Sequence, residues 1–165
     1  MAIGIISDTH DNLSNLIYCL EYLREQNVDT IIHCGDLTDP DMISHFHGFR
    51  LIYTFGNCDH ANRSIRRKIM KLDKNNFAGL SYEGKLEGKS IFAVHGNVKG
   101  QIMDLVRSKS FDYVFSGHTH KRRDETRLTT RLINPGALGG LKLERRSFCI
   151  LDLLSGDLQV IKVTE

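Results

Sequence analysis

The chain has 165 residues, of which 41% are hydrophobic and 25% are charged, and its formal net charge is +2. This length and balance predict one compact globular domain over residues 1–165 and exclude a disordered or membrane-spanning chain. No apolar run approaches the roughly 20 residues that cross a bilayer, and the start of the chain lacks the pattern of a secretion signal, so we expect a cytoplasmic protein. The four cysteines are scattered without a CxxC pair, and the small net charge does not by itself indicate a nucleic-acid partner.

Short apolar runs alternate with polar loops in the first half of the chain. Residues 2–7, 30–34 and 51–55 are predicted strands, because each run is apolar or β-branched and each is followed by a polar turn. The spacing of leucines and isoleucines predicts a helix over residues 12–26, and Pro40 is placed to open another. This order of elements predicts a mainly parallel sheet with right-handed crossovers.

In the second half of the chain the order of strands and turns is different, and this order predicts antiparallel pairing. Residues 80–86 and 90–94 flank Glu87-Gly88, a pair typical of a hairpin turn. The polar turn over residues 154–157 indicates a second hairpin near the end. The other predicted elements are a helix over 101–109 and strands over 113–116, near Leu132, over 147–153 and over 158–163.

Residue types that bind divalent cations follow five of the predicted strands. These loops contain Asp8-Thr9-His10, Gly35-Asp36, Gly56-Asn57, His95-Gly96 and Gly117-His118-Thr119-His120. Strands of one sheet end at a common edge, so side chains far apart in sequence can meet there. Each loop alone is more often an ordinary turn or a surface histidine. Their combination and order predict a metal centre.

Six motifs extend this pattern through nearly the whole chain. They are SDTHDN from Ser7, HCGD ending at Asp36, GNCD from Gly56, VHGN from Val94, SGHTH from Ser116 and INPGA from Ile133. Together they resemble the calcineurin-like metallophosphoesterase superfamily, and in particular its small bacterial and archaeal phosphodiesterases. The resemblance implies an α/β fold with two mixed β-sheets flanked by helices, a four-layer sandwich in a single domain.

The resemblance also implies two divalent metal ions held by seven side chains. The ligands of one metal would be Asp8, His10, Asp36 and His120, and those of the other Asp36, Asn57, His95 and His118. A carboxylate shared by both ions partly neutralises two cations that lie about 3.5–4 Å apart. Because the set contains no thiolate, Mn²⁺ is the first candidate, and Ni²⁺, Co²⁺, Fe²⁺ and Zn²⁺ stay open.

The implied activity is hydrolysis of phosphate esters by a hydroxide that bridges the two metals. We expect the catalytic positions to be Asp36, Asn57, Cys58 and His95. Preorganised charge would then stabilise the phosphoryl oxygens in the transition state.

Two positions depart from the family pattern where a proton donor is common. Many larger relatives have a histidine at the position of Cys58, and small relatives commonly have one at the position of Asn97. General acid catalysis contributes about 10²–10⁴-fold, so its loss predicts a preference for diesters or activated aryl esters over alkyl monoesters. Cys58, His60 and Asn97 are the expected substrate contacts, and Cys58 or His60 is the alternative proton donor.

Two other functions remain as alternatives. One is a phosphomonoesterase or protein phosphatase, which the missing proton donors disfavour, and the other is a non-catalytic scaffold like the retromer subunit that shares the implied fold. Retention of all seven predicted ligands disfavours the scaffold. We therefore expect a small organic phosphodiester or nucleotide-like substrate and no membrane partner. Nucleic acid is less favoured, with Lys121, Arg122 and Arg123 as candidate anion contacts, and assembly into a homo-oligomer is left open.

Overall fold

The computed structural model describes residues 1–163, so the last two residues of the predicted domain lie outside the described part. Two mixed sheets pack face to face, as predicted. The six-stranded sheet has the order β11-β10-β1-β2-β3-β4, and the five-stranded sheet has the order β5-β6-β7-β9-β8. The first two predicted strands lie next to each other in the centre of the six-stranded sheet.

The six-stranded sheet joins a parallel half to an antiparallel half. Its strands are β1 (Ala2–Ile6), β2 (Thr30–His33), β3 (Arg50–Thr54), β4 (Phe77–Gly79), β10 (Ser147–Asp152) and β11 (Leu158–Lys162). Strands β1 to β4 are parallel, which confirms the prediction for the first half. Strand β10 is antiparallel to both β1 and β11, so the predicted terminal hairpin is present.

The five-stranded sheet contains parallel pairs that the sequence did not predict. Its strands are β5 (Ser81–Leu86), β6 (Lys89–Val94), β7 (Tyr113–Phe115), β8 (Arg123–Arg127) and β9 (Thr130–Asn134). The β5–β6 hairpin turns at Glu87 and Gly88, whose φ angles of 49° and 76° suit a two-residue turn. Strands β6, β7 and β9 are parallel, whereas β8 is antiparallel to β9.

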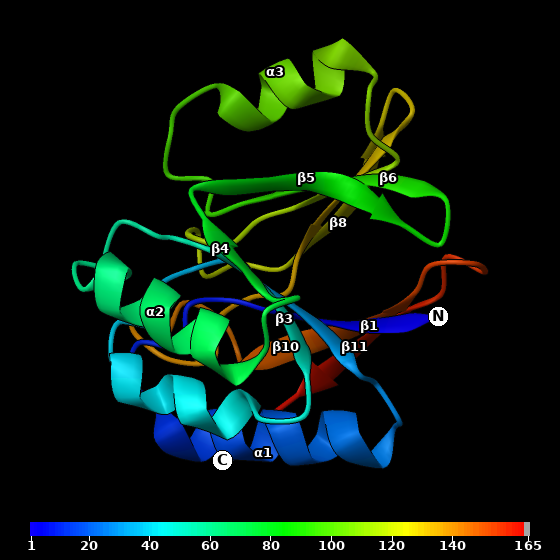
Figure 1. Ribbon diagram of the computed structural model, residues 1–165. Helices are drawn as coiled ribbons and strands as arrows, with labels where there is room; N and C mark the ends of the chain where they lie inside the picture. The colour runs from blue at the N-terminus through cyan, green and yellow to red at the C-terminus, as the bar shows by residue number, and fades with distance from the viewer. Residues whose placement is uncertain (164–165) are drawn as a thin grey trace.

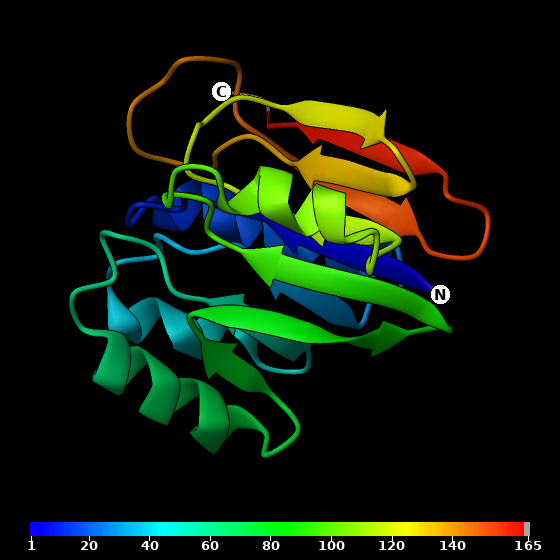
Figure 2. The same cartoon turned by 90° about the horizontal axis from the view of Figure 1, so that it is seen from above.

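Helices cover the outer face of each sheet and complete four layers (Figures 1 and 2). Helix α1 (Leu13–Glu25), the 3₁₀ helix η1 (Pro40–Phe46) and α2 (Asn62–Leu72) lie on the six-stranded sheet, and α3 (Gln101–Ser108) lies on the other. Helix α1 begins where the Asn12 side chain accepts a hydrogen bond from Asn15 N, and Pro40 stands in the first turn of η1. Within residues 1–163 no helix is long and apolar enough to cross a membrane.

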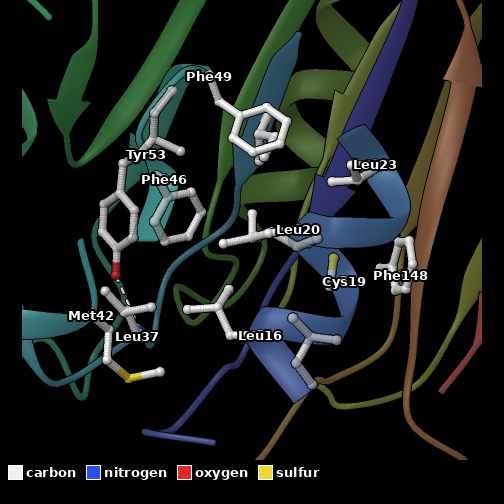
Figure 3. Packing of buried hydrophobic residues seen from close by; sticks show 14 of the residues in the cluster. Leu16, Cys19, Leu20, Leu23, Leu37, Met42, Phe46, Phe49, Tyr53 and Phe148 are labelled. Atoms are coloured by element: carbon white, nitrogen blue, oxygen red, sulfur yellow. Dashed lines mark hydrogen bonds between the residues drawn. The ribbon is translucent and has the colours of Figure 1, made fainter. Parts of the chain in front are cut away.

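Both faces of the six-stranded sheet are buried, which explains the continuous apolar runs of its central strands. On β1, Ile5 contributes to the core between the sheets, while Ile6 contributes to the core beneath α1, η1 and α2. Figure 3 shows this second core, in which leucines of α1 pack toward Phe46 and Phe148. The Tyr53 hydroxyl in the same core accepts a hydrogen bond of 3.1 Å from Leu37 N, in the loop that follows β2.

Candidate metal centre

Five of the predicted ligands have a left-handed backbone, although none is glycine. The φ angles are 53° at Asp8, 41° at His10, 57° at Asp36, 66° at His118 and 54° at His120. This conformation costs an ordinary residue roughly 1–2 kcal/mol. Such strain persists only where surrounding structure fixes it, and it gathers at functional sites. The loops after β1, β2 and β7 are therefore held in shape by contacts beyond their own local preferences.

Asp8 presents one carboxylate oxygen that lacks a hydrogen-bond partner. Its Oδ2 accepts hydrogen bonds from Ser7 Oγ at 2.6 Å and from His118 N at 3.0 Å. Its Oδ1 is buried without a hydrogen bond, 3.3 Å from His120 Nε2 and 3.9 Å from His10 Nε2. The two Nε2 atoms of these histidines are themselves 3.2 Å apart.

His95 faces two further acceptors on the opposite side of the centre. Its Nδ1 donates to the carbonyl of Cys34 at 2.6 Å, which leaves Nε2 as the atom directed inward. Nε2 lies 3.1 Å from Asn57 Oδ1 and 3.3 Å from Asp36 Oδ2. Asp36 Oδ1 accepts a hydrogen bond of 2.8 Å from Cys58 N.

Asp36 connects the two sides of the centre. Its Oδ2 lies 3.8 Å from His10 Nε2. Potential ligand atoms of Asp36, Asp8 and His95 lie close together, and so do those of Asp36, His10 and Cys58. The His118 ring packs edge-on against His95, with 5.1 Å between centroids. Contacts thus link all seven predicted ligands. His60 and Asn97 are exposed, and within residues 1–163 their side chains form no hydrogen bond to this centre.

This arrangement of donors fits divalent cations. Imidazole Nε2 atoms, carboxylate oxygens and an amide oxygen point at one another. Each of these atoms can offer a lone pair, so they face one another as the ligands of a cation do. A buried carboxylate oxygen without a partner, such as Asp8 Oδ1, is costly unless a cation satisfies it. Oxygen and imidazole donors suit first-row divalent metals.

The two central carboxylates differ in electrostatic environment. Burial raises the pKa of Asp8 above its usual value. Burial acts in the same direction on Asp36, but the hydrogen bond and charge of His95 and the hydrogen bonds from Cys58 together hold the Asp36 pKa far below its usual range. Burial, with the adjacent Asp36 carboxylate, raises the pKa of the Cys58 thiol to about 11.

Asp59, the last residue of the GNCD motif, joins the loops after β2 and β3 by hydrogen bonds. Sequence reasoning assigned it no role. Its Oδ2 accepts hydrogen bonds from Asp36 N at 3.0 Å, Gly56 N at 2.8 Å and the Tyr53 hydroxyl at 2.7 Å. Its Oδ1 accepts a hydrogen bond of 3.1 Å from Thr38 N. A charged acceptor directly after the Gly56 turn was the only sequence signal of this role.

His33, the first residue of the HCGD motif, links the loops that carry Asp8 and Asp36, a role that sequence reasoning did not assign to it. It is fully buried, and burial lowers its pKa to about 3, so the ring is neutral. Its Nδ1 accepts a hydrogen bond of 3.0 Å from Gly35 N, and its Nε2 therefore donates to Thr9 Oγ1 at 3.0 Å. The histidine thus connects the loops after β1 and β2 and is not one of the predicted ligands.

Gly117 explains why a glycine precedes the His118-Thr119-His120 loop. A Cβ atom at this position would overlap Ser7 Oγ and lie 2.6 Å from Asp8 Oδ2. The loop after β7 therefore packs directly on the Asp8 carboxylate, and this close approach brings the ligands of the two sheets together.

Residues 1–156 match the calcineurin-like phosphoesterase superfamily domain, so the chain belongs to this superfamily. The chain is 31% identical over 154 residues to a phosphodiesterase of Methanocaldococcus jannaschii, which covers 92% of this chain and 93% of the relative. A solved archaeal phosphodiesterase has a TM-score of 0.94 at 30% identity, covering 99% of this chain and all of that one. Vps29 of Chaetomium thermophilum shares the fold at a TM-score of 0.73 and 16% identity, covering 99% of this chain and 95% of its own. Membership of this family implies a phosphoesterase that uses divalent metal ions.

Proposed function

We propose that the protein is a two-metal phosphodiesterase acting on small organic or nucleotide-like phosphodiesters. The observation that carries the proposal is the buried, unpartnered Asp8 Oδ1, which faces the Nε2 atoms of His10 and His120. Similarity to an archaeal phosphodiesterase over 92% of the chain supports the substrate class. In this proposal Asp8, His10 and His120 hold one metal, Asn57, His95 and His118 hold the other, and Asp36 bridges them.

Bound there, two divalent cations would neutralise charge on the phosphoryl group and make hydroxide available at neutral pH. The chain itself supplies position. Cys34 O and Leu141 O fix the Nδ1 protons of His95 and His120, so that both Nε2 atoms are directed into the centre. The Asp36 carboxylate is ionised at neutral pH, so it can bind cations without losing a proton.

Among residues 1–163 the site lacks a well-matched proton donor. For this reason the proposed substrates are diesters or activated aryl esters rather than alkyl monoesters. A pKa of about 11 keeps the Cys58 thiol protonated at neutral pH but makes it a poor match for general acid catalysis, which works best near the operating pH. His60 and Asn97 are exposed and could contact substrate only from outside the centre. Good leaving groups need little protonation, so aryl diesters should react faster than alkyl monoesters.

The test is to strip the protein with a chelator, restore single metals, and compare hydrolysis of a bis-aryl and a mono-aryl phosphate. We expect activity only after metal is restored, with Mn²⁺ most effective and the diester turned over faster. Asn57→Ala should lower this activity, whereas His47→Ala, an exposed histidine outside the centre, should not. Faster monoester turnover would contradict the diester preference. No activity with any metal would favour a scaffold.

A further inference from the structure

A segment after β9 lies directly over the first metal-binding loop. We call residues 138–141 the strap. Leu138 N donates to Ser7 O at 3.2 Å, and Gly139 N donates to Asp8 O at 2.8 Å. A Cβ on Gly139 would overlap the Thr9 carbonyl, so the strap and the loop are in backbone contact.

The strap touches both histidines on the Asp8 side of the centre. Gly140 has a φ of 64°, and a Cβ there would lie 2.9 Å from His10 Nε2 and overlap the ring. The next carbonyl, Leu141 O, accepts a hydrogen bond of 2.8 Å from His120 Nδ1. That bond places the His120 proton on Nδ1 and directs Nε2 toward Asp8 Oδ1, 3.3 Å away.

Arg146 holds the strap through hydrogen bonds from its guanidinium group. Its side chain is buried, and its guanidinium donates from Nη1 to Gly139 O and from Nη2 to Gly140 O, the latter at 2.6 Å. One planar group that binds two consecutive carbonyls sets the orientation of both peptides just before Leu141. No carboxylate within residues 1–163 forms an ion pair with it, so this buried cation depends on these carbonyls.

The other side of the centre is held differently. His95 Nδ1 donates to Cys34 O, at the end of β2, and in the described part of the chain the hydrogen bonds of the Arg146 side chain go to Gly139 O and Gly140 O, not to His95, Asn57 or His118. Loss of Arg146 would therefore act on one half of the ligand set.

We propose that Arg146 is a positioning residue for one metal ion of the pair, the one bound by Asp8, His10 and His120, through the Gly139–Gly140 carbonyls and Leu141 O. This inference rests on the two-metal function proposed above. Substitution of such supporting groups typically weakens metal binding about 10–100-fold. The effect should fall on a single binding event.

The experiment titrates Mn²⁺ into the metal-stripped protein by calorimetry and compares Arg146→Met with Arg145→Ala, the exposed neighbour. Wild type and Arg145→Ala should bind two ions alike, and Arg146→Met should weaken one of them about 10–100-fold and leave the other unchanged. Arg146→Lys keeps the charge but not the paired donors, so it should restore binding only in part. Equal weakening of both ions, or full rescue by lysine, would overturn the proposal.

Double variants identify which ion is affected. In an Asn57→Ala background, where the Asp8-side ion remains, Arg146→Met should weaken binding of that ion about 10–100-fold. In a His120→Ala background it should change nothing further. If Arg146→Met does not fold, as judged by circular dichroism, Gly140→Ala tests the same strap by pressing on the His10 ring. It should weaken the same single ion, and unchanged binding would count against the strap.

The outcomes separate this inference from the proposed function. A wild-type protein that binds no Mn²⁺ would overturn both. Two-ion binding that Arg146→Met leaves intact would overturn this inference alone.

Discussion

The Asp59 carboxylate accepts hydrogen bonds from backbone N–H groups of the loops after β2 and β3. Both carboxylate oxygens accept hydrogen bonds, Oδ2 from Asp36 N, Gly56 N and Tyr53 Oη and Oδ1 from Thr38 N. Asp59→Asn would place an amide NH₂ against one of these donors. Because leaving buried donors unsatisfied costs about 1–3 kcal/mol, we expect that loss in the free energy of unfolding, measured in urea.

Asp157→Asn is the matched control for Asp59→Asn, because it removes the same charge from an exposed side chain. Its free energy of unfolding should stay within about 0.5 kcal/mol of wild type. Equal stability of the two variants would mean that the Asp59 contacts do not hold the loop.

His33 makes stability depend on pH in a definite direction. Its folded pKa of about 3 lies below its ordinary value of 6.5, so between these values the unfolded chain binds a proton that the folded chain does not. Its contribution is fully present above pH 6.5 and is lost as pH falls toward 3. His33→Asn keeps an acceptor for Gly35 N but does not titrate.

We therefore expect the free energy of unfolding to fall less steeply for His33→Asn than for wild type between pH 6.5 and 4, by on the order of a few kcal/mol. Denaturation at each pH measures this free energy of unfolding. Chelator is present throughout, so metal binding does not contribute. Parallel curves for the two proteins would show that His33 is protonated in the folded state.

At the scale of elements, α1 is held by one apolar face. Leu20 is 1% exposed and packs in the core of Figure 3, whereas Leu13 at the start of the same helix is 42% exposed. Leu20→Ala should lower the free energy of unfolding by about 2–5 kcal/mol, because it leaves a cavity among closely packed side chains. Leu13→Ala should cost under about 0.5 kcal/mol. Thermal or urea unfolding of the pair distinguishes them, and similar losses would contradict this view of the helix.

Elements with a strong local pattern were predictable, and those defined by long-range pairing were not. The buried strands β1, β2 and β3, helix α1 and the hairpin at Glu87-Gly88 all follow from spacing and turn residues. Helix α2 is not among the predicted elements, although Ile65 and Ile69 form its buried face, because cationic side chains separate its few apolar positions. Parallel pairing of β6, β7 and β9 joins strands separated by α3 and β8, so no local pattern indicates it.

The same division applies to the candidate site. Its predicted ligands follow strands directly, so the order of motifs was enough to bring them together in the prediction. Asp59 and Arg146 bind mainly backbone N–H and C=O groups, and His33 binds one backbone N–H, so these partners cannot be recognised from side-chain types. Sequence therefore indicated which candidate ligands lie close together but not what holds them in place.

At the scale of the whole molecule, the centre joins the two sheets. Asp8 and Asp36 follow strands of the six-stranded sheet, whereas His95 and His120 follow strands of the five-stranded sheet. Ions bound between them would contact both sheets in the folded state and neither in the unfolded chain. Metal should therefore stabilise the whole fold against unfolding.

For each ion at a free concentration 100 times its dissociation constant, the gain in the free energy of unfolding is about 2.7 kcal/mol. Thermal unfolding of the stripped protein with increasing Mn²⁺ should show one transition that moves to higher temperature. Asp36→Asn, which weakens the bridge between both ions, should remove most of this shift, whereas His47→Ala should retain it. A shift that Asp36→Asn leaves intact would place the stabilising metal elsewhere on the molecule, because Asp36 lies among close ligand atoms both with Asp8 and His95 and with His10 and Cys58.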